Sequence, residues 1–279
     1  DESNQYLFCA DLPTKFQPNI GKILVTGASG YIGGRLVPEL LARGYKLRVM
    51  VRGESPGYHA LWPDAEVAAA DARRIDSLRV AFRDIDTAYY LIHSLRLGPQ
   101  EFASADLQAA RSFRQAAEEM NVKRIIYLGG LGDIRGSLSS HLRSRAEVAY
   151  ELKKGKVPVT ILRAAVIVGS GSASYEIIQH LVKKLWIIPV PRWAKNKCQP
   201  IAIRDVIKYL VGVLEAGQTS GKSFDIGGPD ILTYEMMLEA LGEILKKKIF
   251  FLPVSFSNIR FYAYMASLLT PVPLSITEC

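Results

Sequence analysis

One glycine-rich segment restricts the possible folds of this chain more than any other. Residues 22–35 read Lys-Ile-Leu-Val-Thr-Gly-Ala-Ser-Gly-Tyr-Ile-Gly-Gly-Arg, which predicts a short buried strand, a tight turn and the start of a helix. In such a turn Gly27 lets the chain reverse, Gly30 lets backbone approach a pyrophosphate, and Gly33 lets the helix lie close to the strand. The N–H groups and dipole of the helix's first turn favour an anion. The segment therefore predicts a dinucleotide-binding turn that uses Thr26, Gly27, Ser29, Gly30, Tyr31, Ile32 and Gly33.

Strands and helices are predicted to alternate through the first two thirds of the chain. Apolar runs that favour strands follow at 46–51, 66–70, 87–92, 122–128 and 158–168, with helices between them at 31–43, 75–83, 101–120 and 140–154. This alternation is typical of an α/β fold with a doubly wound parallel sheet (Rossmann) and right-handed crossovers. We therefore predict an N-terminal arm at 1–20, an NAD(P)-binding Rossmann core at 21–169, and a small C-terminal substrate lobe at 170–279, partly interleaved with the core.

The pattern changes after residue 169. A hydroxyl-rich loop at 169–174 is predicted to open a helix, and two prolines between two tryptophans at 186–193 predict a short extended path. A strand near 199–203 is followed by Asp205 as a helix N-cap. Another strand at 224–226 and a helix capped by Thr233 complete the predicted lobe, which would cover the nicotinamide end of the cofactor.

Composition excludes several classes of protein. Among 279 residues, no apolar run reaches the ~18 residues of a membrane-spanning helix, and 256–269 is predicted to be an internal amphipathic helix. The net charge of +8 is spread over several lysine and arginine clusters without a nucleic-acid motif, so it indicates solvated surfaces, or else an anionic surface or partner. Cys9, Cys198 and Cys279 have no metal-ligand spacing, which predicts no metal site and a reducing compartment.

The first residues are also informative about location. Residue 1 is Asp rather than Met, which indicates a trimmed or processed chain, and residues 1–20 lack a signal peptide's apolar core. The prediction is a cytoplasmic protein, with an organellar matrix or stroma as the alternative.

The end of the second predicted strand decides between the two nicotinamide cofactors. NAD-selective proteins usually place a carboxylate there, whereas an arginine fork binds a 2′-phosphate. This chain has Arg52 at that position, which favours NADP(H) over NAD(H); the alternative is a surface arginine, with Glu54 taking the ribose. Asp71 ends the third strand and either bonds the adenine edge or caps the helix at 75–83. His93 contacts ribose or substrate, or else is a structural histidine bonded to nearby backbone.

The chain resembles the short-chain dehydrogenase/reductase superfamily, in its extended or atypical branch. The glycine turn, Arg52, Asp71 and the helix start at 203–205 indicate the superfamily. Within it the chain is similar to the uncharacterised YbjT-like group, often labelled nucleoside-diphosphate-sugar epimerases, whose members often continue into a second domain. The strings on which this closer resemblance rests lie at 89–94, 124–132, 141–145, 163–172, 199–205, 225–230 and 270–273. The cofactor contacts expected beyond the turn are Arg52, Asp71, Ala72, Leu91, His93, Gly129, Arg145 and Ala164.

The resemblance implies a Ser-Tyr-Lys catalytic set, from which this chain departs. The superfamily's serine position is occupied by Gly129-Gly130, and its spacing from Arg163 places the Tyr-x-x-x-Lys pair at His141 and Arg145. These two lie at i and i+4, on one helix face. Arg145 would hold ribose hydroxyls and keep His141 neutral, so an imidazole with a pKa of about 6–7 would act as acid or base. The alternative is that both residues only tether the cofactor.

A literal Tyr-x-x-x-Lys match exists at Tyr150 and Lys154. It lies nine residues beyond His141 on the same helix, ~13 Å further along, so Tyr150 is predicted to be a half-buried packing residue and Lys154 a partner of the helix dipole.

Two functions remain open. The first is an NADP(H)-dependent oxidoreductase or epimerase with an unknown small-molecule substrate. The second is a non-catalytic NADP(H)-binding sensor or structural subunit, with a protein partner or a further C-terminal domain. Whether Trp186, Trp193 and residues 131–140 plug the nicotinamide face would distinguish them.

Overall fold

A computed structural model describes residues 7–53, 55–93, 99–131 and 140–254 of the chain. The chain divides into two compact units that are not contiguous in sequence, and each is described by itself. Unit 1 comprises residues 1–94, 99–163 and 204–226, and unit 2 comprises residues 95–98, 164–203 and 227–279.

Unit 1 is built on a seven-stranded sheet with the strand order β11-β6-β5-β4-β1-β2-β3. The β1–β2, β1–β4, β2–β3 and β4–β5 pairs run parallel. The strand order reverses between β1 and β4, which is the position where doubly wound sheets bind ligands at the carboxyl ends of the strands. The strands are β1 (Lys22–Thr26), β2 (Lys46–Val51), β3 (Glu66–Ala69), β4 (Thr87–Tyr90), β5 (Arg124–Gly130), β6 (Val159–Ala164) and β11 (Ser223–Ile226).

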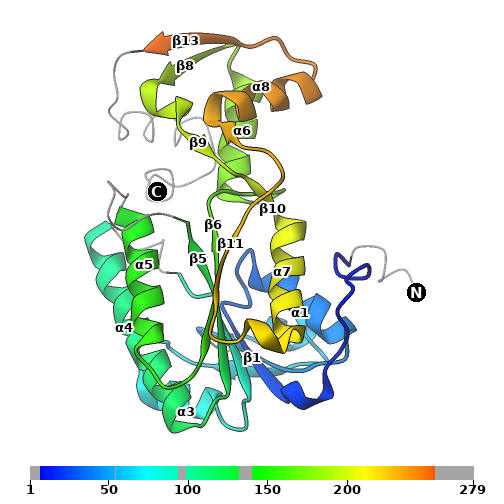
Figure 1. The fold of residues 1–279 in the computed structure, drawn as a ribbon, viewed down its shortest axis with the longest axis vertical. Coiled ribbons are helices and arrows are strands. Elements are labelled where there is room, and N and C mark those ends of the chain that lie inside the picture. The colour runs from blue at the N-terminus through cyan, green and yellow to red at the C-terminus, as the bar shows by residue number, and fades with distance from the viewer. Residues whose placement is uncertain (1–6, 54, 94–98, 132–139, 255–279) are drawn as a thin grey trace. The chain divides into compact units, whose positions relative to one another are not determined.

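Helices cover both faces of this sheet, as the doubly wound prediction requires. Figure 1 shows α3, α4 and α5 on one face, and α1 and α7 on the other. The alternating side chains of β4 contact both layers: the Tyr89 hydroxyl donates to the carbonyl of Leu210 in α7 (2.9 Å), whereas Tyr90 packs against Phe113 in α4. The helices are α1 (Gly33–Ala42), α2 (Pro56–Leu61), α3 (Ile75–Ala81), α4 (Pro99–Glu119), α5 (Ser140–Lys153) and α7 (Ile203–Glu215).

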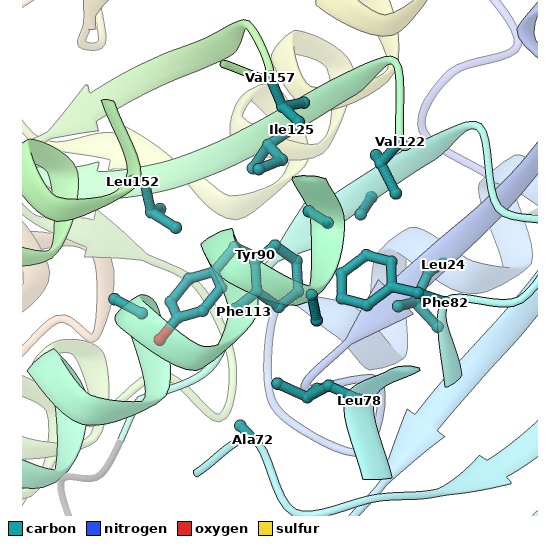
Figure 2. Close-up of a cluster of buried hydrophobic side chains, with 14 of the residues drawn as sticks. Leu24, Ala72, Leu78, Phe82, Tyr90, Phe113, Val122, Ile125, Leu152 and Val157 are labelled. Carbon is teal, nitrogen blue, oxygen red and sulfur yellow. The ribbon is translucent and has the colours of Figure 1, made fainter. Parts of the chain in front are cut away.

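A large buried cluster lies between the sheet and the α3–α4–α5 layer. Figure 2 shows Phe113 between Phe82 and Tyr90, and both ring pairs have centroids 4.8 Å apart at steep angles. Such edge-on pairs add to the free energy of burial. The cluster packs α4 against β4.

Unit 2 is a smaller assembly with a core of its own. Its helices α6 (Ala173–Lys184) and α8 (Tyr234–Ile244) share an apolar cluster with a two-stranded parallel sheet of β8 (Ile187–Pro191) and β13 (Phe250–Val254). Ser172 and Thr233 cap the two helices by accepting the N–H of Tyr175 and of Met236, which confirms the predicted Thr233 cap. The remaining elements are β7 (Ile167–Val168), β9 (Lys197–Cys198), β10 (Ile201–Ala202), β12 (Leu232–Thr233) and the 3₁₀ turn η3 (Arg192–Lys195).

Two predictions for the C-terminal third were wrong. The strand expected at 224–226 in the lobe is β11, which joins the main sheet beside β6. Asp205 does not cap its helix, because α7 already begins at Ile203 and Asp205 lies in its first turn. The first has a cause in α7: its face of Val206, Ile207 and Leu210 is fully buried, so this helix returns the chain to unit 1. The predicted helix at 256–269 lies outside the described residues.

Candidate functional site

The glycine-rich turn connects β1 to α1 and also contacts the end of β4. The Thr26 hydroxyl donates to the carbonyl of Tyr89 (2.7 Å) and accepts the N–H of Leu91 (3.1 Å). Gly27 has a φ of +65°, and a Cβ there would lie 2.5 Å from the Leu91 carbonyl oxygen. A side chain at Gly27 would therefore separate the turn from β4.

The third glycine of the turn explains how closely α1 approaches it. A Cβ on Gly33 would lie 2.3 Å from the Gly27 carbonyl oxygen and 2.7 Å from Cα of Ala28. Ser29 and Gly30 between them are exposed. The turn therefore presents bare backbone before a helix N-terminus, which fits a pyrophosphate.

At the far end of the predicted cofactor, Asp71 is engaged by an arginine that the sequence did not single out. Arg73 donates to both carboxylate oxygens of Asp71 (3.2 and 3.0 Å) through its side chain. This contact, with a smaller contribution from the exposed Arg52, lowers the pKa of the Asp71 carboxyl. Asp71 does not cap α3, whose N-cap position is Arg74. Two arginines thus surround one carboxylate at the ends of β2 and β3.

His93, which follows β4, forms a chain of hydrogen bonds with two other side chains. Its Nδ1 lies 3.0 Å from a carboxylate oxygen of Asp106 in α4, and its Nε2 lies 2.6 Å from Nε2 of His141 in α5. A carboxylate accepts, so Nδ1 of His93 holds a proton, and one proton is then shared between the two Nε2 atoms. Asp106 is 2% exposed, and the Ser144 hydroxyl also lies within reach of it (3.5 Å).

Both imidazoles are held neutral. Burial is the largest cause that lowers the pKa of His93, while the hydrogen bond that His93 donates to Asp106 opposes it. For His141, burial, then His93 and then Arg145 lower the pKa to about 3. The expected pKa of about 6–7 was therefore wrong, because burial and two neighbouring groups penalise the imidazolium more than the sequence indicates. His141 can take a proton only if it passes another one on.

Arg145 faces the end of β5. Its guanidinium donates to the carbonyl of Leu128 and lies 5.2 Å from the centre of the Tyr127 ring, while the Tyr127 hydroxyl donates to the Arg145 carbonyl (3.1 Å). A Cβ on Gly130 would lie 2.8 Å from the side chain of Leu142, which lies one helical turn before Arg145 in α5. Glycine at this position therefore lets α5 approach β5, where the superfamily's serine would stand.

The literal Tyr-x-x-x-Lys match is placed as a surface feature. Tyr150 is 66% exposed, so the prediction that it is half-buried was wrong. Lys154 follows the last residue of α5 and pairs with Glu151 (2.9 Å) while lying 4.8 Å from the Tyr150 ring. The pair faces solvent at the helix's far end.

The remaining residues predicted to contact the cofactor differ in burial and in their neighbours. The methyl groups of Ala72 and Ala164 are buried, the former within the cluster of Figure 2. Gly129 packs against Tyr127, and the Tyr31 ring lies under Arg35, 4.0 Å from its guanidinium carbon. Ile32 precedes α1 as its N-cap residue. Glu54 and most of the loop at 131–140 lie outside the described residues, so whether the nicotinamide face is plugged stays untested.

Sequence reasoning missed Asp106 and Arg73. Asp106 is a polar residue on the apolar face of α4, beside Ala109 and Ala110, and that break in the apolar pattern was the available signal.

Among the described residues, no cluster of His, Cys, Asp or Glu could hold a metal ion. Within the same residues, no helix meets the length and hydropathy required to span a bilayer.

The sheet, the turn and the strand order define an NAD(P)-binding Rossmann protein of the atypical short-chain dehydrogenase/reductase class. Residues 19–265 match the model of the NmrA-like family, and the chain belongs to that family.

Its relatives differ widely in what their names describe. The chain is 26% identical over 231 residues to NADH dehydrogenase (ubiquinone) 1 alpha subcomplex subunit 9, mitochondrial, of Arabidopsis thaliana, covering 80% of this chain and 58% of that protein. It is 30% identical over 169 residues to sterol demethylase protein B of Methylococcus capsulatus, covering 52% and 51%. The chain thus spans less than two thirds of the length of either relative.

Solved structures show the same fold. The NADP(H) complex of triphenylmethane reductase from Citrobacter sp. has a TM-score of 0.74 at 21% identity, with 92% of this chain and 86% of that chain covered. A nucleoside-diphosphate-sugar epimerase from Staphylococcus aureus has a TM-score of 0.73 at 18% identity, with 92% and 88% covered.

Proposed function

We propose that this protein binds NADP(H) in the 26–33 turn and is an oxidoreductase for a small molecule. The turn supports the cofactor, since side chains at Gly27 or Gly33 would fill the space that backbone needs to approach a pyrophosphate. Arg52 supports NADP(H) over NAD(H), because an arginine is the first residue after β2 and the nearby Asp71 is paired with Arg73. Bound NADP(H) supplies or accepts a hydride.

The Asp106–His93–His141 chain is the observation that most supports catalysis. A neutral His141 can accept a proton from a substrate hydroxyl at Nδ1 while its Nε2 proton moves to His93. The imidazolium then rests on His93, next to the Asp106 carboxylate 3.0 Å away. This transfer avoids charging His141, whose pKa of about 3 makes that costly. In the direction of reduction the same chain returns the proton.

A second function, a dinucleotide-binding subunit without turnover, is favoured by Arg145. Its guanidinium donates a hydrogen bond to the Leu128 carbonyl. To take the role of the superfamily's lysine, Arg145 would have to give up this partner. Two relatives are consistent with this second function: the one named NADH dehydrogenase (ubiquinone) 1 alpha subcomplex subunit 9, and the one named photosystem II assembly factor Ycf39, of Trieres chinensis. This function would place the protein in a larger assembly, in the cytoplasm or in an organellar matrix or stroma.

One set of measurements separates the two functions. NADPH binding is titrated by fluorescence, and NADPH oxidation is followed with carbonyl, enone and quinone acceptors, for the wild type, His141→Gln and Asp106→Asn. An oxidoreductase predicts NADPH affinity within about threefold of wild type and a kcat lower by about 10²–10⁴-fold in both variants.

His180→Gln is the matched control, because His180 bonds backbone within α6 of unit 2 and should leave both quantities unchanged. Tight NADPH binding without reduction of any acceptor would favour the subunit. Absence of nicotinamide-nucleotide binding would contradict both functions.

A further inference from the structure

The sheet of β8 and β13 has apolar side chains on both faces. Its inner face, with Ile188 and Phe251, packs against α6 and α8 through residues such as Val182 and Leu241. Side chains alternate along a strand, so the residues between these point away from the core. A parallel sheet normally has both faces covered by other parts of a protein.

The outer face departs from this rule. Phe250 pairs with Ile187, and Leu252 pairs with Pro189, so these four side chains lie together on it. Phe250 is 62%, Leu252 54% and Ile187 47% exposed, and Trp186, just before β8, is 70% exposed. We call Trp186, Ile187, Pro189, Phe250 and Leu252 the apolar face. A contiguous exposed patch of large apolar side chains indicates a binding surface.

Lysines border one end of the apolar face. The end of α6 and the residues that follow it are joined there to the segment after α8, because the Lys247 ammonium donates to the Lys183 carbonyl and the Phe250 N–H donates to the Trp186 carbonyl (2.8 Å). The end of α6 contributes Lys183 and Lys184, and the segment after α8 contributes Lys246, Lys247 and Lys248. Lys247 is part-buried and the other four lysines are exposed. Five positive charges therefore stand beside Trp186 and Phe250.

We propose that unit 2 binds the surface of a membrane that contains anionic lipids, through the apolar face and these lysines. Trp and Phe side chains partition into the boundary between headgroups and acyl chains, and lysines beside them attract anionic headgroups. A lipid surface satisfies both requirements at once, whereas apolar contact with a second copy of this unit would bring the two lysine clusters together. The proposal is independent of nucleotide binding.

Vesicle sedimentation with the full chain tests this. Binding is expected to phosphatidylcholine vesicles that contain phosphatidylglycerol and not to phosphatidylcholine alone, and it should weaken as salt rises. Lys246→Gln with Lys248→Gln should lower the partition coefficient by roughly 25-fold, about fivefold per charge. Trp186→Ser with Phe250→Ser should abolish binding while leaving the circular dichroism spectrum unchanged, since both side chains are exposed.

The matched controls lie in unit 1. Lys156→Gln with Lys222→Gln removes the same charge from exposed positions, and Leu61→Ser with Val80→Ser removes exposed apolar side chains. Both control variants should bind as the wild type does.

Three outcomes would overturn the proposal. One is equal binding, or none, to the two kinds of vesicle. Another is a wild type that is oligomeric by light scattering while Trp186→Ser is monomeric, which would assign the apolar face to a second copy. The third is acrylamide quenching of tryptophan fluorescence, without lipid, that is no stronger in the wild type than in Trp186→Ser, which would show Trp186 protected and assign the face to another segment of this chain.

Discussion

Arg52 is the residue on which the proposed cofactor preference depends. It is exposed at the end of β2, and its positive charge contributes to the lowered pKa of Asp71. Arg52→Asp should reverse the preference: NADPH affinity should fall by about 10–100-fold relative to NADH, because a charged hydrogen bond of ~1.5–3 kcal/mol is replaced by repulsion. Titration of both nucleotides measures the ratio.

Arg83→Asp makes the same charge change at another exposed arginine of unit 1 and should leave the NADPH/NADH ratio unchanged. If Arg52→Asp also leaves it unchanged, Arg52 does not contact the 2′-phosphate.

At the scale of residues, the sequence predicts which residues belong to the candidate site better than it predicts their hydrogen-bond partners. The glycines of the turn follow from local geometry, since the space available to a Cβ is decided by atoms a few residues away. The partners of His93, Asp106 and His141, depend on which helices pack beside it. Asp106 lies on a helix that begins after β4, and its approach to His93 results from packing that no local pattern encodes.

A bidentate ion pair joins the ends of α1 and α7 to the N-terminal segment. Arg43 donates twice to the buried carboxylate of Glu215 (2.6 Å each) and also to the carbonyls of Cys9 and Thr14. Glu215→Gln should lower the free energy of unfolding by about 3 kcal/mol, because it leaves the guanidinium beside a neutral group that has little access to water. Urea denaturation measures the loss.

Glu66→Gln is the control, since Glu66 also pairs with two cations, Lys22 and Arg48, but its side chain is 50% exposed. Its expected loss is below about 1 kcal/mol. Equal losses in the two variants would show that burial does not strengthen the Arg43–Glu215 pair.

The elements themselves were largely predictable. Buried strands with apolar runs, such as β1, β2 and β5, were predicted near their observed bounds, because such runs are too short and too apolar to be surface helices. The sequence did not predict which sheet β11 joins. With four residues, β11 is as short as the strands of a small lobe, but it lies beside β6 in the main sheet after α7 has returned the chain to unit 1.

At the scale of the whole molecule, repeated β–α alternation was sufficient to predict a doubly wound sheet, because few topologies accept it. The composition of the two units was not predictable in the same way. Unit 1 takes up residues 204–226 after the chain has already entered unit 2, and this division is decided by contacts between residues far apart in sequence.

The neutral His141 should also govern the stability of the molecule in acid. Its pKa is lowered from 6.5 to about 3 in the folded state, so between these pH values the unfolded chain binds one more proton than the folded protein. Stability must therefore fall as pH decreases from about 6.5 toward 3, by up to about 1.4 kcal/mol per pH unit from this residue. His141→Gln removes the titrating group and should unfold with a shallower dependence on pH. His59→Gln, at an exposed position on α2, should keep the wild-type slope. Free energies of unfolding from urea titrations between pH 7 and pH 4.5 give the slopes, and equal slopes for His141→Gln and the wild type would mean that His141 is not held neutral by the fold.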